Sequence, residues 1–549
     1  MGERGCFLYL YQNPSAMRAI FLTGCLLVCL CQWSSGQSPV IQWWYDVDDA
    51  AFGNAALADL DQDGQLEVVF STYRNDGYLY ALKTEDGSLL WKYNVGGCSD
   101  AAPLIIDADG DGDLDVILAS SCVPKTFCFD GDSGYVHWVT NMRGSDSPPS
   151  AADLDRDGKL EILHGQFGGY VLCLNAEDGS VKWELAADIN SWIQTAPAIL
   201  DINGDGWLDF IIANWSFGTY HRIWAHRGYD HQLLWENSLP TDVMYHGASF
   251  ADLDKDGKYD LTIGSYDGYV YCLDADSGTQ RWNHAFPSPF YVGAPTSIGD
   301  LNKDGWDDVV YFDGWKVGAL DRYGALLWSY TVPGYGQSFR GAALADMNTD
   351  DTLDVVFGTS TGHLMVLHGA SGAVLHDVDL ATHYGSTDFE IDHGPVVADM
   401  NGDGKLEVFV VGGHAEYPAI GNNYGRAYAV HFPGSAASEN PAPWPMFRHD
   451  IRRSGHYANP LAGLPEEKDK GRQLSVYPNP TTLGSWVEWG NTNENVTISL
   501  LDASGRLIKR ESASEKHRHW INLPSPGAYV VRIETPGGAL AAPLVCLPH

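Results

Sequence analysis

Basic residues are scarce in this chain. Lys and Arg number 33 among 549 residues, against 71 Asp and Glu, so the formal net charge is -38. Nucleic-acid binding and attachment to anionic lipid both depend on clustered positive charge, so this balance excludes nucleic acid and an anionic membrane surface as main partners. So many carboxylates repel one another in a folded chain unless cations bind to them. The composition therefore favours a protein that binds metal cations.

The sequence also lacks an apolar run long enough to cross a bilayer comfortably. The best candidate, residues 19–30, follows Arg18 and has the layout of a secretory signal peptide. We therefore expect residues 1–36 to be a signal peptide, with Met17 as an alternative start, and the mature chain to have no transmembrane segment. A lipoprotein signal is the alternative, because residues 22–25 (LTGC) resemble a lipobox.

Familiar catalytic motifs are missing as well. The sequence contains no H-E-x-x-H, no G-x-S-x-G, no P-loop and no paired-cysteine zinc pattern. Its many carboxylates belong to a repeat, so no single pair of acids can be assigned to catalysis. These absences favour a non-catalytic protein, and a polysaccharide lyase stays open as the enzymatic alternative.

What the chain does contain is an internal repeat of about 48 residues. A nine-residue pattern, D-x-[DN]-x-D-[GD]-x-x-[DE], occurs eight times at intervals of 48, 46, 48, 51, 48, 46 and 53 residues. We call these segments loops 1 to 8. They begin at Asp59, Asp107, Asp153, Asp201, Asp252, Asp300, Asp346 and Asp399.

Each repeat predicts four short strands. In the first repeat these are residues 55–58, 66–71, 78–82 and 89–95, rich in β-branched and aromatic residues and bounded by Gly and Asp turns. No segment shows a convincing period of 3.6, so very little helix is expected. Four strands per repeat are typical of a β-propeller blade.

The beginning of the repeat region predicts how the fold closes. Most repeats end in a strand with a Trp, whereas the eighth lacks one and an extra copy stands alone at residues 40–46. Pairing of this copy with the eighth repeat would leave no open sheet edge. We therefore predict an all-β chain: an eight-bladed β-propeller over residues 37–432, a closing segment and linker over 433–472, and a small β-sandwich over 473–549. The Trp rings are expected between neighbouring blades.

The cysteines outside the leader do not form a disulfide scaffold. Cys128, Cys173 and Cys272 stand where sister repeats have Ala, which favours buried small side chains. Cys98 and Cys122 lie on two connections that share a face of a propeller, so a disulfide between them and a free pair both stay open.

Carboxylates and amides at alternate positions of each loop can converge on one hard cation. Positions 1, 3, 5 and 9 supply side-chain oxygens, position 7 a carbonyl, and the Gly at position 6 permits a sharp turn. Strand-like flanks and an acid at position 9 rather than 12 exclude an EF-hand. We predict up to eight calcium sites. Their ligands are Asp59, Asp61, Asp63, Gln65 and Glu67; Asp107, Asp109, Asp111, Asp113 and Asp115; Asp153, Asp155, Asp157, Lys159 and Glu161; Asp201, Asn203, Asp205, Trp207 and Asp209; Asp252, Asp254, Asp256, Lys258 and Asp260; Asp300, Asn302, Asp304, Trp306 and Asp308; Asp346, Asn348, Asp350, Thr352 and Asp354; and Asp399, Asn401, Asp403, Lys405 and Glu407.

The eight loops differ in charge. Loops 1, 2, 3 and 5 carry Asp at position 3, and the others carry Asn. Loop 7 has Asp351 where the other loops have Gly, so we expect it to be the weakest site or an empty one.

These repeats resemble the FG-GAP or VCBS repeats of the integrin α-subunit propeller. The resemblance rests on the loop motif and on small residues before it, such as Gly293-Ala294-Pro295 ahead of Asp300, and it covers about residues 40–432. The strand that ends in Trp is similar to the docking repeat of quinoprotein-like propellers. The resemblance implies a calcium-stabilised propeller and leaves the ligand open. A quinone cofactor is not expected, because the chain lacks the adjacent cysteine pair of quinoprotein alcohol dehydrogenases.

The C-terminal segment resembles a different family. Tyr477-Pro478-Asn479-Pro480, Asp502-x-x-Gly505-Arg506 and Gly527-x-Tyr529 are similar to the sorting domain of type IX secretion. This implies recognition by the type IX secretion machinery and a location outside a bacterial cell, secreted or on its outer-membrane surface. The last residues, 539–549, lack the basic residues often seen there, and an accessory adhesion module is the alternative.

The face opposite the acidic loops is the candidate ligand face. Aromatic and polar residues are irregularly spaced on its connections, a mixture that suits sugar rings or a protein loop. The candidate residues are Trp192, Tyr245, His246, Tyr291, Tyr335, Arg340, Tyr384 and His393.

Three functions remain open on this basis. The first is a binding or adhesion module for an extracellular glycan or protein. The second is an enzyme similar to the propeller-type rhamnogalacturonan lyases, in which Arg340, His246 or His393 would act as base or charge clamp. The third is a structural component of the surface layer. Few Lys or Arg lie on the candidate face, which favours the first.

Overall fold

The computed structural model describes the repeat region almost completely, and the C-terminal region through its strands. The residues described are 38–216, 218–437, Met446, 474–477, 484–489, 496–502, 507–513, 518–523, 527–535 and 538–546. The predicted signal peptide with its alternative start and lipobox lies outside them, and so does nearly all of the linker beyond residue 437.

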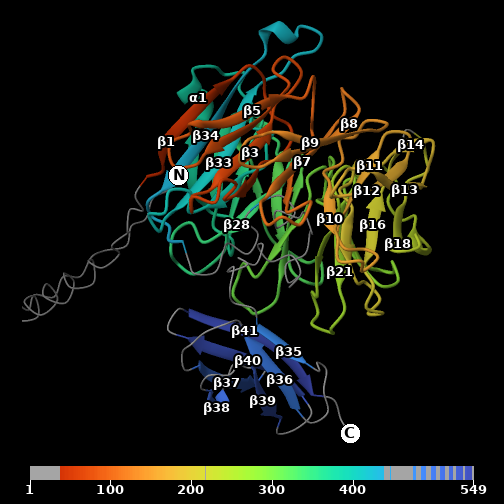
Figure 1. The fold of residues 1–549 in the computed structure, drawn as a ribbon. Coiled ribbons are helices and arrows are strands. Elements are labelled where there is room, and N and C mark those ends of the chain that lie inside the picture. Colours follow the sequence, from red (N-terminus) through yellow and green to blue (C-terminus); the bar gives the residue numbers. More distant parts are fainter. Residues whose placement is uncertain are drawn as a thin grey trace, which may run out of the picture.

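The repeat region forms eight four-stranded antiparallel sheets (Figure 1). Sheet 1 contains β2 (Ala56–Ala58), β3 (Glu67–Ser71), β4 (Tyr78–Lys83) and β5 (Leu89–Asn94). Sheet 2 contains β6 (Leu104–Ile106), β7 (Asp115–Ser120), β8 (Lys125–Asp130) and β9 (Val136–Asn141). Sheet 3 contains β10 (Ser150–Ala152), β11 (Glu161–Gln166), β12 (Tyr170–Asn175) and β13 (Val181–Ala186). Sheet 4 contains β15 (Ala198–Leu200), β16 (Asp209–Ala213), β18 (Ile223–Arg227) and β19 (Leu233–Asn237).

The later repeats form sheets of the same order. Sheet 5 contains β20 (Ser249–Ala251), β21 (Asp260–Gly264), β22 (Val270–Asp274) and β23 (Gln280–His284). Sheet 6 contains β24 (Ser297–Gly299), β25 (Asp308–Asp313), β26 (Lys316–Leu320) and β27 (Leu326–Thr331). Sheet 7 contains β28 (Ala343–Ala345), β29 (Asp354–Gly358), β30 (His363–Leu367) and β31 (Val374–Asp379). Sheet 8 contains β32 (Val396–Ala398), β33 (Leu406–His414), β34 (Tyr424–Phe432) and β1 (Val40–Val47).

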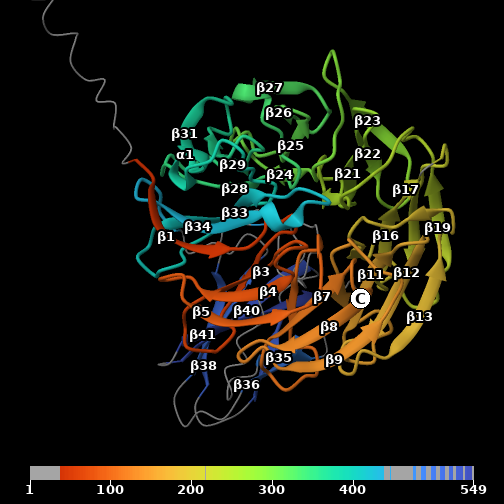
Figure 2. The same ribbon diagram turned by 90° about the horizontal axis from the view of Figure 1, so that it is seen from above.

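The N-terminal strand is the outer strand of the last sheet. β1 pairs antiparallel with β34, from Val40 opposite His431 to Val47 opposite Gly425. The two ends of the repeat region therefore lie side by side, red beside cyan in Figures 1 and 2. Figure 2 shows the sheets following one another around a common centre, the arrangement of a β-propeller. The first strands of neighbouring sheets contact one another, for example β2 with β6 and β24 with β28, so they lie nearest that centre.

Little else interrupts the strands of the repeat region. The additional elements are the paired strands β14 (Ser191–Trp192) and β17 (Trp215–Ser216), the helix α1 (Leu380–Tyr384), and the 3-10 turns η1 (Pro333–Tyr335) and η2 (Ile420–Asn422). No helix among the described residues is long and apolar enough to cross a membrane.

The C-terminal region is also β-structure. One sheet joins β35 (Leu474–Tyr477), β36 (Gly484–Trp489) and β39 (Arg518–Asn522). The other joins β38 (Leu507–Ala513), β37 (Val496–Asp502), β40 (Gly527–Thr535) and β41 (Gly538–Cys546). Apolar residues at alternate positions of β37 and β40 are buried, namely Ile498 and Leu500 in the first strand and Tyr529 and Val531 in the second.

A Trp in the outer strand of most sheets packs on the next sheet, as the sequence predicts. Its ring covers the Gly of the turn between the third and fourth strands, and its indole N–H donates to a nearby carbonyl. Trp91 covers Gly134 and donates to the Gly131 carbonyl oxygen over 2.6 Å. The same contact joins Trp43 to Gly87, Trp138 to Gly179, Trp235 to Gly278, Trp282 to Gly324 and Trp328 to Gly372.

Two joints depart from this pattern. His231 takes the place of the turn Gly after sheet 3, and its φ of 60° matches that of the glycines it replaces. Its ring lies 4.1 Å from the Trp183 ring, centroid to centroid. After sheet 7, His376 stands in for the Trp and contacts the Phe432 ring at 5.4 Å.

The cysteines follow the sequence prediction where the structure describes them. Cys128, Cys173 and Cys272 are free and buried. Cys98 and Cys122 form a disulfide. This bond links the connection between β5 and β6 to the connection between β7 and β8, and both lie on the same end of the sheets.

We predict that a methyl group at a Trp-covered Gly breaks the joint between sheets. In Gly278→Ala the new Cβ would lie 2.4 Å from the Trp235 ring, at a φ of 67°. Unfavourable φ costs about 1–2 kcal/mol and overpacking adds about 1–3 kcal/mol to the loss of unfolding free energy. Gly385→Ala is the control, because Gly385 also has positive φ but nothing lies within 4 Å of its Cβ position. Urea unfolding should show the larger loss for Gly278→Ala, and equal losses would contradict the packing role.

Candidate metal loops and binding face

The eight acidic loops share one location and one hydrogen-bond pattern. Each connects the first and second strands of its sheet, and position 9 is at or next to the start of the second strand. In loop 1 the Leu60 amide donates to Glu67 Oε2 over 2.8 Å, and the Gly64 amide donates to Asp59 Oδ2 over 3.1 Å. Both bonds recur in all eight loops. The second oxygen of positions 1 and 9 is left for another partner.

Backbone conformation curls each loop around its acids. The prediction of positive φ at position 6 is confirmed, with values from 80° to 98° at the glycines. Asp351 adopts 68° in loop 7, and its amide still donates to Asp346 Oδ2 over 2.7 Å. Position 4 also has positive φ, even where it is Gln62 or Lys255, which the sequence analysis missed. Such strained residues persist only where the surroundings hold them.

The oxygens converge as a cation site requires. In loop 1, oxygens of Asp59, Asp61 and Glu67 lie within 4.8 Å of one another. The same holds for acids of loops 2, 3 and 5, and for Asp403 and Glu407 with His431 in loop 8. Several carboxylate oxygens of the eight loops are buried without a hydrogen-bond partner. They are Asp59 Oδ1, Glu67 Oε1, Asp153 Oδ1, Asp209 Oδ1, Asp300 Oδ1 and Asp354 Oδ1. All six belong to position 1 or 9, so the residues present fit a hard cation.

Burial makes these carboxylates unfavourable on their own. Removal from water raises the pKa of Glu67 to about 7, that of Asp209 to about 7 and that of Asp354 to about 8. Neighbouring acids of the same loop push in the same direction. A bound cation would offset both effects.

The opposite face carries a continuous run of aromatic rings. Because the strands alternate in direction, the second-to-third and fourth-to-first connections lie on the end opposite the loops. Neighbouring rings there are 4.5–5.5 Å apart, centroid to centroid, and β14 pairs with β17 between them. We call this run the aromatic arc. Its members are Phe167, Trp192, Trp215, Tyr245, Tyr266, Tyr291, Phe290, Trp315 and Tyr335.

The arc remains accessible to a ligand. Tyr335 is 70% exposed and Phe290 is 49% exposed, while the other members are half-buried. Four of its members are among the ligand residues predicted from the sequence, whereas the rings on the second-to-third connections, such as Trp215 and Trp315, were not predicted. The sequence did contain a signal for these rings. Cys98 and Cys122 lie on a fourth-to-first and a second-to-third connection, and both kinds of connection were expected on one face.

The remaining predicted ligand residues lie elsewhere or are buried. Tyr384 stacks on Tyr424 at 5.0 Å, away from the arc, beneath Arg426. Arg340, His246 and His393 are 7%, 5% and 2% exposed. Of the eight predicted residues, the structure therefore joins the four aromatic ones of the arc and places the others in packing roles.

Arg340 compensates a cluster of carboxylates near the centre of the ring of sheets. Burial raises the pKa of Asp100, Asp146 and Asp392, and the Arg340 guanidinium, which lies 5.3 Å from the Tyr245 ring, offsets part of each rise. Burial outweighs this effect, and the pKa of Asp100 and of Asp392 is raised to about 7. Each acid lies on a fourth-to-first connection, so the cluster is close to the innermost strands.

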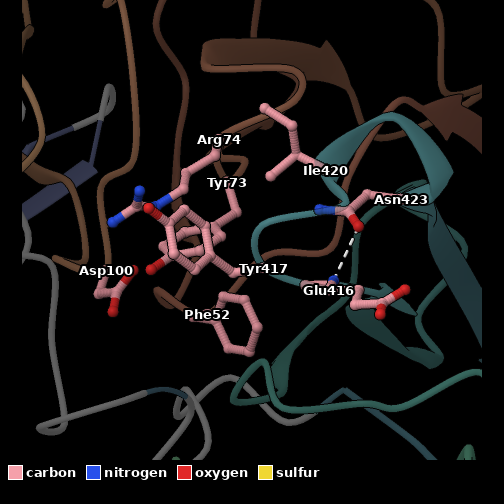
Figure 3. Close-up of a pocket in the computed structure, with 9 residues that line it drawn as sticks. Phe52, Tyr73, Arg74, Asp100, Glu416, Tyr417, Ile420 and Asn423 are labelled. Atoms are coloured by element: carbon pink, nitrogen blue, oxygen red, sulfur yellow. Dashed lines mark hydrogen bonds between the residues drawn. The ribbon is translucent and has the colours of Figure 1, made fainter.

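A small pocket opens beside this cluster (Figure 3). It has a volume of about 160 Å³ and joins the first sheet to the second-to-third connection of the last. Arg74 lies over the Tyr417 ring at 4.7 Å, and Asp100 lines the same pocket.

Three family models match parts of the chain. A model described as outer membrane protein assembly factor BamB matches residues 227–428, and an FG-GAP-like repeat matches residues 59–118. A secretion system C-terminal sorting domain matches residues 475–545. The chain thus contains an FG-GAP-like repeat, a BamB-like β-propeller region and a type IX sorting tail. The tail supports a secreted or cell-surface bacterial protein.

Known proteins share the fold at low identity. The biofilm matrix protein Bap1 of Vibrio cholerae is 16% identical with a TM-score of 0.57, covering 75% of this chain and 94% of Bap1. Sqt1 of Saccharomyces cerevisiae is 12% identical with a TM-score of 0.50, covering 71% of this chain and 98% of Sqt1. Tetrathionate hydrolase of Acidithiobacillus ferrooxidans is 20% identical over 234 residues, 41% of this chain and 44% of that protein. The match thus spans less than half of the hydrolase.

We predict that removing Arg340 destabilises the fold in a pH-dependent way. The folded pKa of Asp100 and of Asp392 is above the ordinary value, so ionisation lowers stability as pH rises from about 4 to about 7. Arg340→Met removes the cation that offsets this loss, and we expect a loss of about 3–5 kcal/mol at pH 8 and less at pH 5.

Urea unfolding of variant and parent at both pH values checks this. Arg143→Met is the control, because Arg143 forms an exposed pair with Glu184 that contributes about 0–1 kcal/mol. A loss for Arg340→Met that is the same at pH 5 and pH 8 would contradict the compensating role.

Proposed function

We propose that this chain is an exported calcium-binding β-propeller that binds an extracellular glycan along the aromatic arc. In this proposal its eight sheets are eight blades of one ring, and the pairing of β1 with β34 closes that ring. The aromatic arc is the observation that carries the binding function.

The geometry of the arc suits sugar rings. Its rings are linked over several sheets, and each leaves part of its surface to solvent. Aromatic faces bind the apolar faces of sugars, while nearby polar groups orient the hydroxyls. A row of such rings can engage several residues of one polysaccharide chain, so weak contacts would add up.

Charge narrows the class of glycan. The formal net charge of -38 disfavours polyanionic chains, so a neutral polysaccharide is the better ligand. The enzymatic alternative has no specific observation in its favour, because Arg340, His246 and His393 are buried and Arg340 is already engaged with carboxylates. A lyase needs such groups open to its substrate.

Export and a matrix setting are compatible with this role. The sorting tail supports a protein outside the cell. One solved relative is a biofilm matrix protein, although the likeness itself concerns the fold alone.

Calcium is the cation that the loops suit best. Ca²⁺ takes 6–8 oxygens, and each loop offers side chains from positions 1, 3, 5 and 9 and the carbonyl of position 7. Lys159 or Trp207 at position 7 would contribute only that carbonyl. The ion would bind the buried oxygens that lack partners and neutralise repelling acids, and in this way it would stabilise the ring.

The glycan proposal predicts a loss of binding when rings of the arc are removed. Trp315→Ala and Tyr335→Ala should each weaken binding to a neutral polysaccharide about tenfold or more, which corresponds to about 1.4 kcal/mol. Tyr135→Ala is the control, because Tyr135 is 71% exposed but lies between β8 and β9, on the loop face. A glycan array followed by isothermal titration measures this. Equal effects of all three variants, or capture of a protein and no glycan, would reject the proposal.

The calcium proposal predicts a large loss of thermal stability on chelation. A site at a calcium concentration of 100 times its Kd contributes about 2.7 kcal/mol, and several sites act together. We therefore expect excess EDTA to lower the Tm by more than about 10 °C, and calcium to restore it better than magnesium does. Scanning calorimetry with each ion measures the shift. A Tm that is indifferent to chelation would remove calcium from the proposal.

A further inference from the structure

Basic side chains reach into some acidic loops and not into others. In loop 3, Lys182 Nζ lies 2.5 Å from Asp155 Oδ2 and 2.7 Å from Glu161 Oε1. In loop 5, Arg281 contacts Asp254, and its second terminal nitrogen lies 2.5 Å from Asp260 Oδ1. Lys182 and Arg281 both belong to the fourth strands of their sheets, so they come from outside the repeated motif.

Loop 1 has a basic partner of a different kind. Lys83, at the end of the third strand, lies 2.9 Å from Asp61 Oδ2 and 3.0 Å from Asp63 Oδ2. It does not contact Glu67, whose Oε1 stays buried and unpartnered.

These cations follow the identity of position 3. Loops 1, 3 and 5 have Asp at position 3 and a Lys or Arg against it. Loops 4, 6, 7 and 8 have Asn there, and among the described residues no Lys or Arg forms an ion pair with an acid at position 1, 3, 5 or 9 of these loops. Four carboxylates with one internal cation leave the same formal charge, -3, as three carboxylates alone. In loops 1, 3 and 5 the extra acid at position 3 is thus matched by a built-in counter-charge. Loop 2 is the exception among the described residues, because no Lys or Arg pairs with Asp109, and His137 Nε2 instead lies 3.2 Å from Asp115 Oδ1.

The loops also differ in the partner of one oxygen of the position 9 acid. We call it the inner oxygen, and it is the one that does not accept from the position 2 amide. In loops 3 and 5 it is held by Lys182 or Arg281. In loops 1, 4 and 7 the corresponding atoms, Glu67 Oε1, Asp209 Oδ1 and Asp354 Oδ1, are buried and without a hydrogen-bond partner. A buried carboxylate oxygen that lacks a partner is costly, so these three loops have the greater need of a cation.

We propose that five of the loops form two classes of calcium site. Loops 1, 4 and 7, whose inner position 9 oxygen has no partner, bind calcium tightly, and loops 3 and 5, in which Lys182 or Arg281 holds that oxygen, bind it weakly. This rests on the proposed calcium binding and deepens it. Loop 3 keeps one unpartnered oxygen, Asp153 Oδ1, so its affinity is lowered and not abolished. This ranking reverses the order that acid counts give to loops 3 and 5 against loops 4 and 7. It also differs from the expectation, based on Asp351 at the Gly position, that loop 7 is the weakest site.

A matched pair of position 9 variants tests the classes. Asp209→Asn in loop 4 should remove one tightly bound calcium, measured by isothermal titration and by metal analysis after dialysis. Asp260→Asn makes the same chemical change in loop 5 and should leave the number of tightly bound ions unchanged. Equal losses in the two variants would overturn the proposal.

Removal of the internal cation gives the converse test. Lys182→Met should raise the calcium affinity of loop 3 at least tenfold, add one tightly bound ion, and lower the Tm in EDTA but not in saturating calcium. Lys159→Met is the control in the same loop, because Lys159 pairs with Glu177 and not with the acids of the site. If the Lys182→Met protein binds calcium but its number of tightly bound ions is unchanged, the two classes are rejected and the calcium proposal itself is not. Absence of calcium binding by the parent protein rejects the calcium proposal itself.

Discussion

The fold depends on one constraint: an acid at the start of the second strand of each sheet is buried with only one of its oxygens satisfied by the backbone. The hydrogen bond from the position 2 amide ties the loop to the strand, and the remaining oxygen needs a positive partner. Some loops meet that need with a Lys, Arg or His of the same sheet, and others leave it open. The acidic composition of the whole chain follows from repeating this unit eight times.

Antiparallel pairing separates this electrostatic task from the proposed ligand binding. The loops occupy one end of each sheet, while the connections at the other end are free to vary in length and composition. That end carries the aromatic arc and the cluster around Arg340. The joints between sheets are made by the Trp of one sheet and the turn Gly of the next, and the turn Gly is on the same end as the loops. Substitutions on the binding face therefore need not disturb the loops, and this independence allows one scaffold to present many binding surfaces.

Most of the fold could be predicted because the same pattern of strands and loop occurs eight times in the sequence. The bounds of β2, β3, β4 and β5 agree with the predicted strands within one residue, and β1 occupies the predicted place beside β34. His231 could not be foreseen, because its role depends on a φ of 60° beneath the Trp183 ring. A sequence records which residue fills a turn but does not state the conformation that makes the substitution acceptable.

The candidate sites were harder to predict because their partners come from different strands. The acids of a loop are close in sequence, so the motif finds them, but Lys182 and Arg281 are more than twenty residues away and belong to no motif. Counting acids therefore overstates the charge that a loop presents to an ion. The arc shows the same limitation, because Trp315 and Tyr335 become neighbours only when two connections meet on one face. Charge balance and ring contact are properties of the assembled sheet. In the calcium proposal the loop motif therefore marks where a cation would bind, and the neighbouring strands would determine how strongly.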